Sequence, residues 1–451
     1  MHDRTPDWIA AAAGARLLRA VDPTREGSAA AGPRRAVIDS RVVLPGDLFV
    51  GLPGTQVDGG RFAAQTLAAG AWGALVHPDH ADAAQEAAAG VVLAADDPLL
   101  ALQQLATAWR RQLAAVVIGI TGSTGKTSTK DLVAAMLRAG GRDRLIATSQ
   151  NFNTEIGLPL TVLGAPPGTD TLVLEKGMRG PGQIAQLTRI SEPDVAIITN
   201  VGPVHLELLG SVAAVAAAKA ELLTSLRPGG TAVIPADEPL LEQYLRDDLQ
   251  IVRFGPGGDI EDLPGVRLLS EGIELTSAHM RRNALAAAAA VRAAGIEPRG
   301  DIEVALSARR GQRERLAGGV IVVDDCYNAN PMSMRAALDD LAATAPARRV
   351  AVLGDMLELG PDEKRFHSEI GVHARDRGVD VLVVVGERAA YLGAGSNLGN
   401  VHAVPDAATA ARLVPTLVQD GDTVLIKASR GIGLEVVAEA LRAARPGEDV
   451  A

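Results

Sequence analysis

The stretch VVIGITGSTGKTSTK, residues 116–130, constrains the fold of this chain more than any other. Residues 116–120 are apolar and largely β-branched, which predicts a buried strand. A turn of small residues follows at 122–125, and residues 128–138 have the apolar spacing of a helix. A strand, a glycine-containing turn and a helix N-terminus in this order direct backbone N–H groups and the positive end of the helix dipole at an anion. We therefore expect a phosphate-binding loop here.

The residues after the turn indicate a nucleotide. Lys126 is expected to contact the β- and γ-phosphates, and the Thr127 hydroxyl to bind Mg²⁺. The usual spacing of this motif places its first glycine where this chain has Ile120, so a chance GKT in a glycine-rich chain is the alternative. The flanking strand and helix favour nucleotide binding. The residues expected to bind the nucleotide at this loop are Gly122, Ser123, Thr124, Gly125, Lys126, Thr127 and Ser128.

The order of the expected elements predicts an α/β protein of three domains. The length of 451 residues is enough for several domains, each with its own core. From the phosphate-binding loop onward, apolar strands alternate with helices, which predicts mainly parallel sheets covered by helices. We expect a small α/β domain at 1–97, a central P-loop domain of the ATPase type with a parallel sheet at 98–308, and a Rossmann-like domain at 309–451.

The composition argues against several classes of protein. The net charge of −10 at pH 7 argues against a nucleic-acid-binding protein, which would carry basic stripes. The single cysteine, Cys326, leaves no partner for an internal disulfide. No apolar run is long enough to span a membrane, and charged residues interrupt the N-terminal segment where a signal peptide would be apolar. We expect a cytoplasmic protein that neither inserts in a membrane nor binds nucleic acid.

Polar residues follow the expected strands of the central domain. Glu175 ends a strand at 171–175, and His205 follows a strand at 195–200. Ligands of parallel sheets bind beyond the carboxyl ends of the strands, so we expect both residues near the P-loop. Glu175 would bind Mg²⁺ through a carboxylate oxygen, although a solvated carboxylate is the alternative. Taken alone, His205 would be structural or exposed, and Lys219 would be a solvated lysine on a helix at 211–226.

Three further groups are candidate binding residues. The Asp39-Ser40-Arg41 motif would bind a diphosphate or uridine through its donors, or would only form a turn with a local side-chain bond. Asn283, near the start of an expected helix at 279–294, would bond an adenine edge or only cap the helix. In the third domain, polar residues at strand ends suit a zwitterionic small ligand, although loop chemistry also explains them; these residues are Asn328, Asn330 and Asp355.

Together these motifs resemble the Mur ligase family over nearly the whole chain and in the same order. The resemblance rests on DSR, GDLFVGLPG, TGSTGKTSTK, NFNTEIGLPLTVL, ITNVGPVHLELLGS, DDCYNANPMSM, GDMLELG and KASRG. It implies an ATP- and Mg²⁺-dependent ligase of peptidoglycan precursor synthesis, with roles in cell wall formation, cell shape and cell division. The partners implied are UDP-N-acetylmuramoyl-tripeptide and D-alanyl-D-alanine, joined by a monomeric enzyme through an acyl phosphate. The Asp-Asn-Pro-Arg motif expected of the sibling that adds a diamino acid is absent.

The resemblance also implies roles for individual residues. Lys126 matches the P-loop lysine, and a metal site would be formed by Thr127, Glu175 and His205. Lys219 matches a lysine that family members carry as a carbamate, and would act in catalysis with Lys126 and His205. The nucleotide would also contact Asn283, Asp325 and a phosphate-binding arginine, which is Arg310 or Arg313. The UDP-substrate would contact Asp39, Ser40, Arg41, Asn153 and Thr154, and the dipeptide Asn328, Asn330 and Asp355.

The chain departs from the family pattern at three places. Family members usually carry two asparagines where this chain has Asn153 followed by Thr154. The helix that binds adenine usually begins with His-Asn, and here begins with His279 and Met280. Lys176 follows Glu175 where an apolar residue is common. The alternative functions are a sibling Mur-type ligase, a folylpolyglutamate-type ligase, or an ATP-binding regulatory protein without catalysis.

Overall fold

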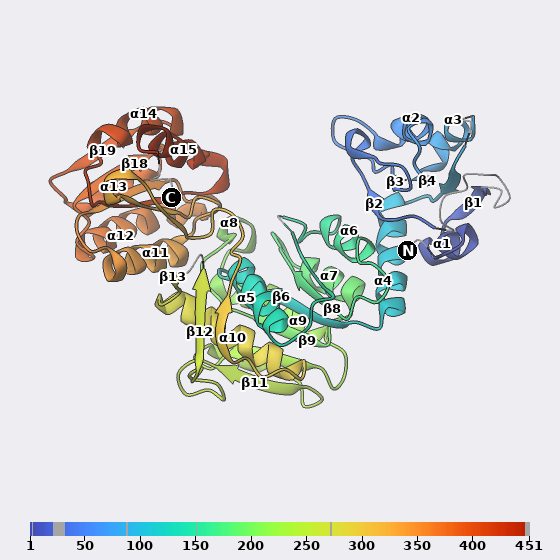
Figure 1. Cartoon of the computed structure of the whole chain (residues 1–451), viewed down its shortest axis with the longest axis horizontal. Helices are drawn as coiled ribbons and strands as arrows, with labels where there is room; N and C mark the ends of the chain where they lie inside the picture. The colour runs from blue at the N-terminus through green and yellow to red at the C-terminus, as the bar shows by residue number, and fades with distance from the viewer. Residues whose placement is uncertain (2, 21–31, 87–88, 150, 271–272, 447–451) are drawn as a thin grey trace.

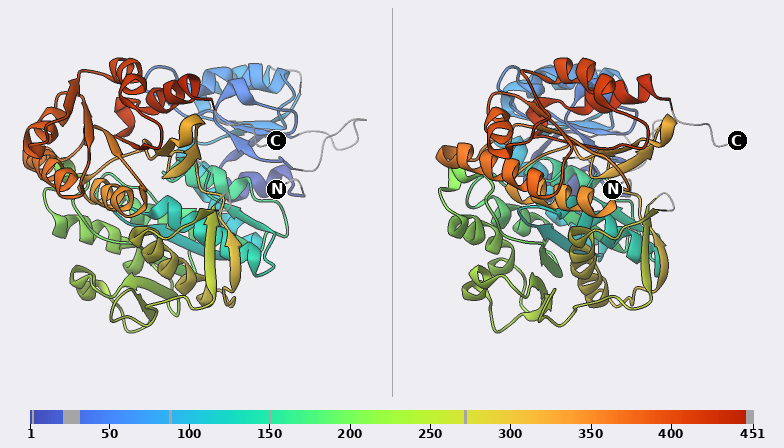
Figure 2. Two further views of the ribbon diagram at one scale, coloured as in Figure 1. Left: turned by 60° about the vertical axis from the view of Figure 1, so that its left-hand side comes forward. Right: turned by 90° about the vertical axis from the view of Figure 1, so that its left-hand side faces the viewer.

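The computed structural model describes residues 1, 3–20, 32–86, 89–149, 151–270 and 273–446. Three domains, each built on a sheet of its own, follow one another along the chain. In Figure 1 the N-terminal domain lies at the right and the C-terminal domain at the left, with the central domain below and between them. The turned views of Figure 2 show the central domain beneath both of the others.

The N-terminal domain is a five-stranded sheet in the order β1-β5-β4-β3-β2. Only β1 runs antiparallel to its neighbour, β5. Residues 59–62 form a tight 3₁₀ turn before α2, and the Asp58 carboxylate accepts the Gly60 N–H at 2.8 Å at the start of this turn. The elements are α1 (Pro6–Ala13), β1 (Arg16–Arg19), β2 (Ala36–Val37), β3 (Leu48–Val50), α2 (Ala63–Ala68), β4 (Gly73–Val76), α3 (Ala81–Gln85) and β5 (Val91–Ala94).

The central domain is a six-stranded parallel sheet in the order β11-β10-β9-β6-β8-β7. Its strands are β6 (Val116–Thr121), β7 (Leu145–Ala147), β8 (Thr171–Glu175), β9 (Val195–Ile198), β10 (Thr231–Pro235) and β11 (Gln250–Phe254). Its helices are α4 (Pro98–Leu113), α5 (Lys126–Ala139), α6 (Gly157–Leu163), α7 (Gln183–Ser191), α8 (Leu206–Leu209), α9 (Val212–Thr224) and α10 (Ala278–Ala293). A separate small sheet joins β12 (Val266–Ser270), β13 (Ile273–Glu274) and β14 (Gly300–Glu303).

The C-terminal domain is a second six-stranded sheet, in the order β15-β16-β20-β17-β18-β19. All of its pairings are parallel except that of β15 with β16. Its strands are β15 (Gln312–Arg315), β16 (Ile321–Asp324), β17 (Arg349–Gly354), β18 (Val381–Val385), β19 (Val401–Val404) and β20 (Thr423–Lys427). Its helices are α11 (Pro331–Thr344), α12 (Glu363–Asp376), α13 (Ala389–Ser396), α14 (Ala407–Leu417) and α15 (Glu435–Ala444).

The predicted α/β class with mainly parallel sheets is confirmed. Strands such as β6, β8 and β18 are buried along most of their length, as sheets covered by helices on both faces require. The expected domain boundaries, after 97 and after 308, fall between elements and stay a prediction. In the described part of the chain we find no helix with the length and apolarity needed to cross a membrane.

Lys176 is a charged residue placed inside the central domain. Its side chain is fully buried beside α7, where its amine donates to the Ser191 hydroxyl at 2.5 Å and to the Leu187 carbonyl at 3.3 Å. A Cβ on Gly119 would lie 2.8 Å from the Lys176 Cε, so the glycine in β6 makes room for this side chain. Burial lowers the pKa of Lys176 to about 7, because the charged form loses its hydration.

This burial predicts a pH-dependent cost to stability. The unfolded chain keeps the proton up to its ordinary pKa of 10.5 and the folded chain only up to about 7. Stability therefore rises with pH between these values. At about 1.4 kcal/mol per pKa unit, the cost below pH 7 is on the order of 5 kcal/mol. We expect Lys176→Met to stabilise the protein by several kcal/mol near pH 7, and less as pH rises towards 10.5, in chemical unfolding.

The exposed Lys364 supplies the control for this prediction. Lys364→Met should leave the dependence of stability on pH unchanged. A Lys176→Met variant whose stability relative to the parent does not change over this pH range would contradict the assignment of a neutral buried amine.

Candidate functional site

The turn between β6 and α5 forms the predicted anion-binding loop. Gly125 has a φ of +77° and directly precedes Lys126, the first residue of α5. A Cβ on Gly122 would lie 1.8 Å from the Thr199 hydroxyl, so only glycine fits between the turn and the end of β9. The Lys126 amine folds back onto the Gly122 carbonyl at 2.7 Å. The backbone N–H groups at the start of α5 lie beside this lysine, as phosphate binding requires.

Thr127 and Glu175 meet at the carboxyl ends of β6 and β8. The Thr127 hydroxyl donates to one Glu175 oxygen at 2.8 Å, and the Asn153 amide donates to the other at 2.8 Å. A buried hydroxyl and a buried carboxylate side by side offer the hard oxygen donors that Mg²⁺ prefers with nucleotide phosphates. The described residues contain no group of three or more His, Cys, Asp or Glu side chains arranged to hold a metal ion. The site therefore fits a cation whose remaining ligands come from phosphate and water.

Lys219, on α9, is a buried amine without a partner. Its side chain is 2% exposed, and it makes no hydrogen bond or ion pair within the described part of the chain. Burial, and then the charge of Lys126, lower the pKa of Lys219 well below its ordinary value. Burial also lowers the pKa of Lys126, and the Arg310 charge lowers it further against the opposing effect of Glu175. These buried amines repel one another and make the site attractive to anions.

His205 lies at the N-terminus of α8 with a φ of +52°. Its Nδ1 lies 2.5 Å from a carboxylate oxygen of Glu358, which belongs to the C-terminal domain. Burial lowers the pKa of His205 more than Glu358 raises it, and Lys126 and Lys219 lower it further. The imidazole is therefore neutral near pH 7.

A cavity of about 660 Å³ joins these groups across the boundary between the central and C-terminal domains. Its lining includes, from the central domain, Lys126, Thr127, Asn153, Thr154, Glu175, His205 and Asn283. From the C-terminal domain it includes Arg310, Asp325, Asn328, Asn330 and Lys427. The structure thus brings the P-loop together with most of the predicted metal, nucleotide and dipeptide residues.

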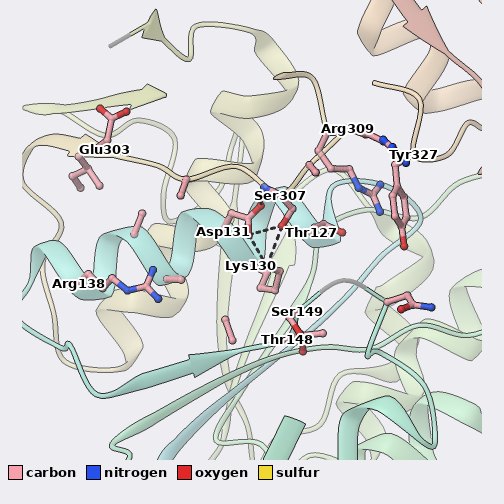
Figure 3. Close-up of a pocket in the computed structure, with 18 of the residues that line it drawn as sticks. Thr127, Lys130, Asp131, Arg138, Thr148, Ser149, Glu303, Ser307, Arg309 and Tyr327 are labelled. Carbon is pink, nitrogen blue, oxygen red and sulfur yellow. Dashed lines mark hydrogen bonds and ion pairs between the residues drawn. The ribbon is translucent and has the colours of Figure 1, made fainter. Parts of the chain in front are cut away.

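A larger cavity of about 1070 Å³ lies along the neighbouring face of α5. Figure 3 shows Lys130, Asp131 and Ser307 joined by hydrogen bonds along its wall. Glu303 lies towards one end, and Arg309 and Tyr327 lie at the other (Figure 3). Thr127 lines both cavities, so the two meet at the P-loop.

The two candidate phosphate-binding arginines, Arg310 and Arg313, make different contacts in the structure. Arg313 donates to the Asp340 carboxylate and the Thr344 hydroxyl of α11, both at 2.6 Å. Arg310 instead stacks on the Tyr327 ring, with its Cζ 3.9 Å from the ring centroid, and lines the cavity. Arg310 is thus the arginine available to a phosphate.

Several predicted residues make contacts that differ from their expected roles. One Asp355 oxygen accepts the Ala389 N–H at 2.6 Å at the start of α13, and Asp355 lines neither cavity. The expected contact between Asp355 and the dipeptide stays a prediction. Asp39 accepts from the Arg41 side chain at 2.7 and 2.9 Å, which is the local turn bond left open above. The binding role of the Asp39-Ser40-Arg41 motif stays a prediction.

Sequence patterns missed two residues at the domain boundary. Lys427, at the end of β20, pairs with Asp325 at 2.6 Å and donates to the Asn328 carbonyl at 3.0 Å. Its place at a strand end is a signal that could have found it. Glu358 lies in a loop after β17, and its contact with His205 depends on how two domains dock, so no local pattern predicts it.

Comparison with known families gives three matches along the chain. The model described as Mur ligase family, catalytic domain, matches residues 36–115. The Mur ligase middle domain matches 120–291, and the Mur ligase, glutamate ligase domain, matches 309–430.

Curated relatives are similar over nearly their whole length. UDP-N-acetylmuramoyl-tripeptide–D-alanyl-D-alanine ligase of Synechocystis is 36% identical over 421 residues, with 90% of this chain and 92% of the relative covered. The Bacillus subtilis protein of the same name is 36% identical, with 89% and 92% covered. The Escherichia coli protein of that name is 34% identical, with 90% and 92% covered.

Solved structures of two proteins are similar to the structure of this chain over nearly its whole length. MurF from Acinetobacter baumannii has a TM-score of 0.81 and 28% identity, with 97% of this chain and 98% of that chain covered. MurF ligase from Thermotoga maritima in complex with ADP has a TM-score of 0.77 and 28% identity, with 91% and 97% covered.

The P-loop geometry predicts that Gly125→Ala weakens nucleotide binding. A Cβ there would lie 2.5 Å from the Asn283 side-chain oxygen, and alanine at a φ of +77° is strained by about 1–2 kcal/mol. We expect ADP affinity, measured by calorimetry, to fall at least about tenfold.

Gly141→Ala is the matched control, because Gly141 has a φ of +85° but no atom within 4 Å of its Cβ position. It should lower stability without changing ADP affinity. Equal ADP affinity in the two variants would contradict the assigned contact between the turn and Asn283.

Proposed function

The chain belongs to the Mur ligase family, and on that premise we propose that it is an ATP-dependent ligase that adds D-alanyl-D-alanine to UDP-N-acetylmuramoyl-tripeptide. The observation that carries this proposal is the cavity in which Lys126 and Glu175 of the central domain meet Arg310 of the C-terminal domain. The named relatives align over 90% and 89% of this chain and support the choice of substrates. The reaction belongs to peptidoglycan precursor synthesis.

We propose that the three domains divide the substrates among them. Residues 1–97 would bind the UDP-substrate through Asp39, Ser40 and Arg41, and residues 98–308 would bind ATP. Residues 309–451 would complete the ATP site and bind the dipeptide near Asn328 and Asn330. The enzyme would act as a cytoplasmic monomer, and its product would serve cell wall synthesis and hence cell shape and division.

The chemistry we propose has two steps. A carboxylate oxygen of the tripeptide attacks the γ-phosphorus of ATP, the bond to the β–γ bridging oxygen breaks, and ADP leaves an acyl phosphate. The neutral amine of the dipeptide then attacks the acyl carbon and loses a proton to solvent, and the tetrahedral intermediate expels phosphate to give the amide.

The chain's own residues position and neutralise these groups. Lys126 and the N–H groups at the start of α5 stabilise the negative charge that develops on the transferred phosphoryl group. Arg310 approaches the same phosphates from the C-terminal domain. Thr127 and Glu175 would hold Mg²⁺, which when bound neutralises phosphate charge. The remaining rate enhancement comes from holding the carboxylate oxygen in line with the γ-phosphorus and its leaving oxygen, and from holding the amine close to the acyl carbon.

The test of this function is phosphate release by the purified protein with ATP, Mg²⁺ and UDP-N-acetylmuramoyl-tripeptide. We expect release to depend on D-alanyl-D-alanine and to yield the UDP-pentapeptide by mass spectrometry. Release that responds to another amino acid, or to folate and glutamate, would instead assign a sibling activity. The absence of any ADP formation would favour a regulatory protein.

The separation of the two arginines predicts different effects of their removal. We expect Arg310→Ala to lower kcat at least about 100-fold, because it removes a charge from the transition state. Arg313→Ala should mainly lower the melting temperature, since it breaks the bond to Asp340. Steady-state kinetics that show the larger loss of kcat in Arg313→Ala would reverse the assignment.

Because the amine of Lys219 is buried and has no partner among the described residues, we predict that it is carbamylated. Burial lowers its pKa and so favours the neutral amine, which is the form that reacts with CO₂; the carbamate would add an oxygen ligand to the metal site. We expect Lys219→Ala to lose at least about 100-fold in activity and to be partly rescued by formate or acetate.

Lys176→Met is the matched control, because it replaces another fully buried lysine, whose amine is hydrogen-bonded to Ser191 and Leu187. It should keep its activity and respond to neither acid. Full activity of Lys219→Ala without added acid would exclude the carbamate.

A further inference from the structure

Two residues in the left-handed backbone conformation meet across the boundary between the central and C-terminal domains. His205 has a φ of +52° and Glu358 a φ of +61°. This conformation costs a residue with a Cβ about 1–2 kcal/mol. Such strain persists where the surrounding structure holds it, and it concentrates at functional positions. We therefore expect the contact between these two residues to have a functional role.

The contacts of Glu358 tie it to the central domain. One carboxylate oxygen lies 2.5 Å from the His205 Nδ1, and the other lies 3.9 Å from the Arg179 Nε. The Glu358 carbonyl accepts the Glu207 N–H at 3.4 Å. Next to it, a Cβ on Gly360 would lie 3.4 Å from the Glu207 backbone, so the two loops are packed closely. A C-terminal-domain carboxylate is thus held by two central-domain side chains.

This bond determines the state of the imidazole ring. An ionised carboxylate only accepts hydrogen bonds, so the proton of the neutral ring lies on Nδ1. The other nitrogen, Nε2, then carries a lone pair and has no hydrogen-bond partner within the described residues. His205 lines the cavity that contains Lys126 and Glu175. Nε2 is therefore the nitrogen left to accept a hydrogen bond or ligate a metal ion.

We propose that Glu358 is a positioning residue for His205, which it holds as the Nδ1–H tautomer only when the C-terminal domain is docked on the central domain. The inference rests on the proposed ligase function and adds a residue to it. A carboxylate that accepts from the far nitrogen of a histidine fixes its orientation and makes it a better ligand. The carboxylate and the histidine come from different domains. His205 is therefore fixed in this tautomer only when the two domains dock.

The first test reads the tautomer in the protein without substrates. We expect long-range ¹H–¹⁵N spectra of the histidine side chains to show the Nδ1–H form for His205, identified by its loss in His205→Gln. In Glu358→Ala the Nε2–H form should appear. Glu207→Gln is the control, since Glu207 joins this contact through its backbone N–H and its exposed carboxylate makes no hydrogen bond or ion pair with Glu358 in the described part of the chain, so the tautomer should be unchanged.

The second test reads the consequence for the reaction. We expect Glu358→Ala to lower kcat and the affinity of the ADP complex for Mn²⁺ by about 10- to 100-fold. The KM for ATP should change little, because the P-loop is intact. Glu358→Gln, which keeps the size of the side chain, should retain the parent melting temperature. Its losses of kcat and of Mn²⁺ affinity should be smaller than those of Glu358→Ala.

The two tests separate failure of this inference from failure of the proposed function. An Nε2–H tautomer in the parent protein, or a Glu358→Ala variant that matches Glu207→Gln in tautomer and Mn²⁺ affinity, would overturn the role of Glu358. A parent protein with the Nδ1–H tautomer but no ligase product would overturn the function and leave the contact standing.

Discussion

Binding the phosphates of a nucleotide requires several backbone N–H donors and a cation close together. The backbone can come this close only at a turn without side chains, and the rest of the structure depends on this constraint. The turn between β6 and α5 meets this constraint with Gly122 and Gly125, because a Cβ at either would collide with Thr199 or Asn283. The remaining groups of the site come to this turn because parallel strands end at one edge of a sheet. Glu175 ends β8, next to β6, and its carboxylate reaches the Thr127 hydroxyl.

Electrostatics explains why the site needs both domains. Lys126 and Arg310 both line one cavity, and their positive charges lie close enough that the Arg310 charge lowers the pKa of Lys126. Phosphates and a carboxylate offset this positive charge, so the cavity favours negatively charged substrates. The C-terminal domain supplies Arg310 and the Asp325–Lys427 pair, and it also supplies the carboxylate that holds His205. Neither domain alone contains the full set.

The features of the fold that depend on local sequence patterns were predictable from the sequence. The strand, turn and helix at the P-loop were predictable from apolar spacing and small residues, and the strand-end rule brought Glu175 and His205 to the same site. The small sheet of β12, β13 and β14 was not predicted, because its short strands carry polar residues and are paired through tertiary packing. The choice of Arg310 over Arg313 required knowing that Asp340, on α11, binds Arg313. The strand-end rule placed Asp355 at the end of β17, but the bond from the Ala389 N–H to its carboxylate depends on the packing of α13 and was not predictable from the sequence.

Transfer of the γ-phosphoryl group to the substrate's carboxylate is the step that all these groups serve. The most direct test is to label the reacting carboxyl group of UDP-N-acetylmuramoyl-tripeptide with ¹⁸O and to follow the label during turnover with ATP and D-alanyl-D-alanine. An acyl phosphate requires that one labelled oxygen leave with the released phosphate, as mass spectrometry would show. Retention of both labelled oxygens in the peptide, with unlabelled phosphate, would contradict the mechanism and with it the role assigned to the cavity.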